Sequence, residues 1–197
     1  MSMRLTILGC GSSTGVPRVG NDWGKCDPAD PRNRRRRSSA LFERRRGGKA
    51  TTVLIDTGPD LREQLLAADV RHLDGVLFTH DHADHIHGID DLRMLAYTGK
   101  RRINVWFDQR TRASVTSRFG YCFVMPEGSS YPPILTGHDI EPPQPIVIEG
   151  EGGAVEAVPI PQEHGDIPSL GFRVGHVAYS PDISGLPPSS VPLLEGL

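Results

Sequence analysis

The sequence has 197 residues, of which 37% are hydrophobic and 23% charged, and this predicts one domain (residues 1–197) with a core of ordinary size. Its formal net charge of −2 gives no overall basic field for nucleic acid, and no apolar run is long enough to cross a membrane. Three sparse cysteines without a CxxC pair argue against a disulfide framework or a zinc ribbon, and with no signal-peptide pattern they favour a cytoplasmic location.

Short apolar segments alternate with turn residues through the first half of the chain. Strands are expected at 4–8, 39–44, 51–56 and 75–79. Gly47-Gly48 indicates a hairpin turn between the second and third of these strands. Helices are expected at 60–68, with Asp60 as the cap, and at 89–97.

The second half of the chain also mixes strands and helices. A strand is expected at 103–107, a weaker helix at 111–119, and strands at 146–149, 154–160, 170–174 and 176–180. Residues 120–145 are rich in proline, glycine and aromatic residues, a composition that would suit a lid. Residues 189–195 have the signals of a helix start, which suggests that further sequence follows, although a frayed tail would contain the same residues. The whole pattern indicates a mixed α/β fold with sheet layers covered by helices.

A dense group of ionisable residues follows the apolar segment 75–79. His80, His82, Asp84 and His85 lie within six positions, with Asp81 between the first two. Imidazole and carboxylate are ligands of zinc, iron and manganese, and alternate residues of a loop can face one cation. A solvated polar loop is the alternative, but so many ionisable groups beside a buried strand would stay unpaired without a cation.

The string HxHxDH after an apolar strand resembles the signature of the metallo-β-lactamase superfamily, and Ile55-Asp56-Thr57-Gly58 resembles the segment that supports it. The resemblance implies a four-layer αβ/βα sandwich that here lacks its last C-terminal elements. It also implies two divalent metal ions, with zinc as the first candidate and manganese or iron as alternatives. The implied ligands are His80, His82, His164 and Asp182 for one ion, and Asp84, His85 and Asp182 for the other.

The resemblance further assigns supporting roles. Two metals about 3.5–4 Å apart lower the pKa of a shared water and so supply hydroxide near neutral pH, which Asp84 would orient. Asp56 is a candidate for holding a histidine ring through its other N–H, although it would also suit the end of a strand. His87 is expected to support a ligand or to line the rim of the site rather than to bind metal itself. The family also has a later histidine ligand, and no histidine follows His176 here.

The early segment Leu8-Gly9-Cys10-Gly11-Ser12-Ser13-Thr14-Gly15-Val16-Pro17 resembles the phosphodiesterase branch that includes phosphoribosyl cyclic phosphate phosphodiesterase and ribonuclease Z. The candidate substrate contacts are Ser12, Ser13 and Arg37. The two serines lie in a loop that can offer N–H groups to phosphate, although an ordinary turn is the alternative. The guanidinium of Arg37 suits phosphate, although a solvated basic strand is the alternative.

The resulting hypothesis is a metal-dependent phosphodiesterase that cleaves a small cyclic phosphate or nucleotide-like ester. The partner is then a small-molecule phosphate ester, nucleic acid and membrane are not expected, and a homodimer is possible. Thioester or lactone hydrolysis on the same centre remains open, as does a phosphate-ligand-binding module with an incomplete metal site.

Overall fold

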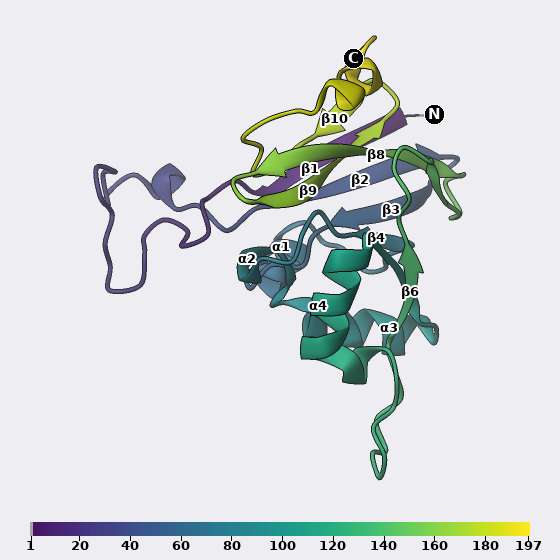
Figure 1. Ribbon diagram of the computed structural model, residues 1–197. Coiled ribbons are helices and arrows are strands. Elements are labelled where there is room, and N and C mark those ends of the chain that lie inside the picture. The colour runs from purple at the N-terminus through teal and green to yellow at the C-terminus, as the bar shows by residue number, and fades with distance from the viewer. Residues whose placement is uncertain (1) are drawn as a thin grey trace.

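The computed structural model describes residues 2–197 and contains two β-sheets that pack face to face (Figure 1). The six-stranded sheet has the order β1-β2-β3-β4-β5-β6, with β1 Ser2–Gly9, β2 Ser39–Arg46, β3 Lys49–Ile55, β4 Gly75–Leu77, β5 Ile103–Phe107 and β6 Leu135–Asp139. The first three strands pair antiparallel, and β3 to β6 pair parallel. The antiparallel four-stranded sheet has the order β10-β9-β8-β7, with β7 Ile146–Ile148, β8 Val155–His164, β9 Ile167–Val174 and β10 Val177–Tyr179.

The α-helices cover the outer face of the six-stranded sheet (Figure 1). They are α1 Leu61–Ala67, α2 Ala83–Ile86, α3 Arg93–Gly99 and α4 Gln109–Phe119. The 3₁₀ helices are η1 Pro31–Asn33, η2 Ile89–Leu92, η3 Gly120–Cys122 and η4 Pro188–Leu194. Within residues 2–197, η4 is the element on the outer face of the second sheet, where Ser190 Oγ donates to the Pro161 carbonyl at 2.6 Å.

Two apolar layers hold the sheets and helices together. On β3, Leu54 packs with the helices, whereas Val53 and Ile55 pack against the second sheet. A strand that is covered on both faces needs apolar side chains on both, which explains the continuous apolar run where a half-exposed strand would alternate. The predicted mixed α/β class is confirmed, with layers in the order helices, six-stranded sheet, four-stranded sheet and η4.

The predicted elements are found with some differences. Gly47 and Gly48 form the expected tight turn with φ of +59° and +77°, a conformation that favours glycine. The helix expected at 89–97 is divided into η2 and α3. Asp60 occupies the N-cap position of α1 as expected, but its side chain makes no cap hydrogen bond and instead accepts from Arg37.

Two segments lie outside the layers. Residues 10–37 leave β1 and loop away from the sheets before the chain returns as β2 (Figure 1). Residues 120–145 contain η3 and the strand β6, which pairs with β5 and was not predicted. Among residues 2–197, no helix is both long and apolar enough to cross a membrane.

Candidate metal centre

The polar side chains predicted to bind metal lie where strands of both sheets end. His80 follows β4 by three residues, Asp56 follows β3 directly, His164 ends β8 and Asp182 follows β10. β3 and β4 are parallel neighbours, and β8 and β10 both run antiparallel to β9, so each pair ends at one edge of its sheet. A backbone hydrogen bond from Leu170 N–H to the Thr79 carbonyl, at 2.9 Å, joins the two sheets beside the site.

The loop after β4 turns immediately into the single-turn helix α2. His82 occupies the N-cap position, and Asp84 and His85 lie in the turn that follows. The turn is closely packed, because a Cβ added to Gly58 would lie 2.2 Å from the Asp84 carbonyl oxygen. The close contact with Gly58 therefore fixes the position of the backbone that carries Asp84 and His85.

Two groups of three side chains offer ligand atoms that all lie within 4.8 Å of one another. The first group is His80, His82 and His164, and the second is His80, His85 and Asp182. His164 Nε2 is 3.3 Å from His82 Nδ1, and Asp182 Oδ2 is 2.6 Å from His85 Nε2. Asp84 belongs to neither group, but its Oδ2 lies 3.5 Å from His85 Nε2. The structure thus brings all six predicted ligands to one place.

Two buried nitrogen atoms at this place have no hydrogen-bond partner in residues 2–197. They are Nε2 of His80 and Nε2 of His85, whose side chains are 1% and 0% exposed. The short His85–Asp182 contact lacks hydrogen-bond geometry. A buried polar atom without a partner is costly, so two such nitrogens facing carboxylates and further imidazoles fit a divalent cation. His80, His82 and His164 would hold one ion, and His80 or His85 with Asp182 and Asp84 the other.

Asp56 fixes the rings of the buried half of the site. Its side chain is fully buried and accepts hydrogen bonds from Thr79 N, Thr79 Oγ1 and His85 Nδ1 at 2.8, 2.8 and 2.7 Å. Thr79 Oγ1 also lies 2.9 Å from His80 Nδ1. Both buried rings therefore have their Nδ1 atoms engaged and their Nε2 atoms turned toward the centre, as metal-ligating histidines require.

The two buried histidines are tuned in opposite directions. Burial, and after it the neighbouring His85, lower the pKa of His80 to about 4, so the His80 ring is neutral near pH 7. Burial also acts against protonation of His85, but Asp56, Asp182 and Asp84 outweigh it and raise the pKa of His85 to about 12. A cation on His85 Nε2 would replace that proton, because only the neutral ring binds metal.

The remaining predicted residues lie around this group rather than in it. His87 is exposed and packs edge-on against the ring of Phe119 at 5.7 Å between centroids. Ser12 and Ser13 are exposed in the loop after β1, where the Ser12 carbonyl accepts from Gly15 N–H. The guanidinium of Arg37 forms an ion pair with Asp60 at 2.6 Å. A contact of Arg37 with substrate would have to share this guanidinium with Asp60.

Sequence reasoning did not single out three side chains that adjoin the centre. Thr79 links Asp56 to His80, and Ser38 Oγ and Tyr179 OH form a hydrogen bond of 2.7 Å. The position of Thr79 directly before the first histidine was the available signal. Ser38 and Tyr179 are 141 residues apart in sequence, and nothing local indicates that they meet.

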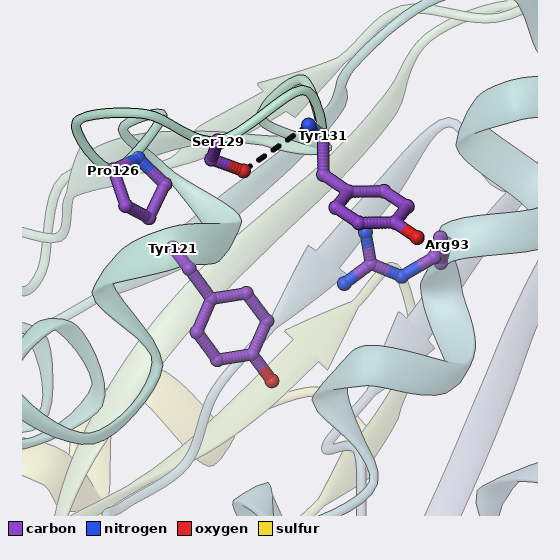
Figure 2. Close-up of a pocket in the computed structure, with 5 residues that line it drawn as sticks. All are labelled: Arg93, Tyr121, Pro126, Ser129 and Tyr131. Carbon is purple, nitrogen blue, oxygen red and sulfur yellow. Dashed lines mark hydrogen bonds between the residues drawn. The ribbon is translucent and has the colours of Figure 1, made fainter.

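A separate hollow of about 440 Å³ lies beside the aromatic segment that the composition suggested as a lid. Figure 2 shows its lining of Arg93, Tyr121, Pro126, Ser129 and Tyr131. The Arg93 guanidinium carbon lies 5.9 Å from the Tyr121 ring centre and 6.0 Å from that of Tyr131, and Arg93 is also paired with Asp90. Residues between α4 and β6 project from the helical side of the molecule, away from the end of β8 that carries His164 (Figure 1).

Residues 51–197 match the model of the beta-lactamase superfamily domain, and the chain belongs to this superfamily. The predicted superfamily is thus confirmed, and in this fold the histidine–aspartate centre offers two groups of ligand atoms for metal ions. The chain is 34% identical to a diphosphatase from the PhnP family, whose crystal structure matches with a TM-score of 0.83 over 100% of this chain and 72% of that one. It shares the fold of the short form of human tRNase Z, at 18% identity and a TM-score of 0.58 over 98% of this chain and 74% of that one.

A further relative is an octanoyltransferase from Porphyromonas gingivalis (strain ATCC BAA-308 / W83). It is 33% identical over 195 residues, which are 98% of this chain and 37% of that protein. The chain therefore spans just over a third of the length of this relative.

Proposed function

We propose that this protein is a phosphodiesterase with two divalent metal ions, for which zinc is the first candidate, and that it cleaves a small cyclic phosphate or nucleotide-like ester. The observation that carries the proposal is the pair of buried Nε2 atoms on His80 and His85, which have no hydrogen-bond partner within residues 2–197 and which each belong to a group of three ligand atoms. The relative at 34% identity is a diphosphatase, which supports a phosphorus centre as the site of attack.

Bound metal ions would supply Lewis acidity, which activates water and neutralises charge on the phosphoryl group in the transition state. The side chains of the protein do the rest. Asp56 holds the His85 ring, and through Thr79 it orients His80. Asp84 has a pKa held below its usual value, against the effect of burial, by the neighbouring His85. Its carboxylate is therefore ionised and able to accept a proton from water that approaches the phosphorus.

The shape of the centre agrees with a small and accessible substrate. His82 and Asp182 are exposed, whereas His80 and His85 are buried beneath them. Arg118 Nη1 donates to the Asp81 carbonyl at 3.2 Å and Arg110 lies 3.8 Å from the Asp81 carboxylate, so α4 adds cationic side chains beside the metal loop. An anionic ester would approach from this open side, and guanidinium groups suit phosphate.

The experiment is metal analysis of purified protein combined with turnover of bis-p-nitrophenyl phosphate. His82→Ala is expected to lose one metal equivalent and at least 100-fold in kcat/KM, because it removes an exposed ligand without disturbing the buried core. The control is His72→Ala, which removes another exposed histidine that lies near Asp74 instead. Wild-type protein without metal, or equal turnover by His82→Ala and wild type, would end the proposal.

Acyl thioester hydrolysis on the same centre is the second candidate. It is favoured by the octanoyltransferase relative, since a protein named for octanoyl transfer handles an acyl group. Parallel assays with an octanoyl thioester and a phosphodiester separate the two candidates. A kcat/KM for the thioester that exceeds that for the phosphodiester would replace the first proposal by the second.

A further inference from the structure

Two hydroxyl groups meet beside the metal centre and have no role in the chemistry described so far. Ser38 lies directly before β2, and Tyr179 is the last residue of β10. Their side chains form a hydrogen bond of 2.7 Å between the two sheets, and both are half-buried. The ring of Tyr179 packs against the apolar layer between the sheets, which fixes the direction of its phenol.

The positions of these two residues place the hydroxyl pair next to the ligands. Tyr179 precedes Asp182 by three residues. On the other side, a Cβ added to Gly58 would lie 3.8 Å from the Ser38 carbonyl oxygen and 2.2 Å from that of Asp84, so Ser38 and Asp84 border the same glycine. Burial raises the pKa of Tyr179, and the nearby carboxylates of Asp56 and Asp182 raise it further, which agrees with this placement and keeps the phenol protonated.

The two hydroxyl groups have one more proton than their mutual hydrogen bond uses. Each hydroxyl carries one donor hydrogen, and one of the two is used in the bond between Ser38 and Tyr179. Neither side chain makes another hydrogen bond within residues 2–197, so the second hydrogen has no acceptor in the described protein. A half-buried donor at the edge of a site can donate to a bound molecule.

The charge around the pair indicates what kind of acceptor it would serve. Neutral hydroxyl groups cannot compete with imidazole and carboxylate for a divalent cation. The centre carries the carboxylates Asp56, Asp84 and Asp182, so an anionic ligand needs hydrogen-bond donors to offset them as well as cations.

We infer that the Ser38–Tyr179 hydroxyl pair donates a hydrogen bond to a non-bridging phosphoryl oxygen of the substrate at the metal centre. This inference rests on the proposed phosphodiesterase function and adds a substrate-contacting residue pair to it. No bond is made or broken by the pair, which keeps its protons throughout. Its effect is to orient the phosphoryl group and to stabilise negative charge on its oxygen.

The test measures the binding of inorganic phosphate to metal-loaded protein by calorimetry, together with bis-p-nitrophenyl phosphate kinetics. Tyr179→Phe removes the phenol and keeps the ring, and Ser38→Ala removes the partner hydroxyl. Each is expected to weaken phosphate binding about 3- to 10-fold, the range of one neutral hydrogen bond, and to lower kcat more than it raises KM. The double variant is expected to lose less than the product of the two single losses, because the two hydroxyls act as one unit.

Tyr97→Phe is the matched control, since Tyr97 is exposed on α3 and its phenol accepts from Arg93. It is expected to equal wild type in phosphate affinity, kcat and metal content. Phosphate affinity and kcat in Tyr179→Phe and Ser38→Ala that equal those of Tyr97→Phe would overturn the inference, as would loss of metal from Ser38→Ala. If Tyr179→Phe fails to fold, Ser38→Ala alone decides the result.

The failure of the inference can be told apart from failure of the proposed function. Wild-type protein that loads metal but neither binds phosphate nor cleaves the diester refutes both. Wild-type protein that does both, while the two hydroxyl variants do so equally well, refutes only the role of the pair.

Discussion

Replacing Asp56 by asparagine is the most direct test of how the buried half of the centre is held. The change keeps the size of the side chain, and asparagine tolerates the backbone φ of +62° that Asp56 adopts. It removes the negative charge that faces His85 Nδ1 at 2.7 Å and the two donors of Thr79 at 2.8 Å. Both partners are buried, so solvent cannot replace the lost charge.

The size of the effect follows from these contacts. A hydrogen bond to a charged group contributes about 1.5–3 kcal/mol, and the amide of asparagine can accept some of the three bonds but also turns N–H groups toward the donors. We expect the metal-free protein to lose about 3 kcal/mol, which lowers Tm by about 6–12 °C for a domain of this length. Metal affinity is expected to fall about 10- to 100-fold, since the ring of His85 is no longer held by a carboxylate.

The assay is thermal unfolding in a chelator, followed by a zinc titration against a competing indicator. Asp69→Asn is the matched control, because Asp69 also has a positive φ, of +50°, but is exposed and paired with Arg71. The control is expected to change Tm by no more than about 1–2 °C, as surface substitutions do. Equal zinc affinity in Asp56→Asn and Asp69→Asn would refute the argument that Asp56 positions His85.

Two further predictions concern protonation and packing. The pKa of His80 is about 4 in the folded protein, whereas an unfolded chain takes up this proton near pH 6.5. Protonation therefore favours the unfolded chain, so the stability of the fold is fully present above about pH 6.5 and decreases as pH falls toward 4. In chelator, wild type is therefore expected to lose about 2 kcal/mol more than His80→Gln in urea unfolding between pH 7 and pH 5, and equal losses would contradict the shift. Gly58→Ala is expected to lower both Tm and metal content, because its Cβ would overlap the Asp84 carbonyl and overpacking costs about 1–3 kcal/mol. Gly120→Ala, whose Cβ would meet nothing within 4 Å, should leave both unchanged, and a similar loss in the two variants would show that the packing argument is wrong.

The sequence predicted the α/β class and the positions of most strands because these depend on local patterns. The run Val53-Leu54-Ile55 and the turn Gly47-Gly48 specify a buried hairpin without reference to the rest of the chain. β6 was missed, because Leu135–Asp139 contains glycine and polar residues and is a strand only through its pairing with β5. The same distinction applies to Asp60, whose sequence position suits a helix cap but whose carboxylate is taken by Arg37 from another segment.

By itself, the sequence determined which residue types could hold a cation, since His80, His82, Asp84 and His85 are fixed relative to one another by a single turn after a buried strand. The superfamily resemblance named His164 and Asp182, but only the tertiary structure brought them to the group. It alone decided that His87 faces Phe119 and that Ser38 meets Tyr179. The physical reason is that these contacts depend on the register of paired strands and on the packing of two sheets, and a shift of one residue would turn each side chain to the opposite face.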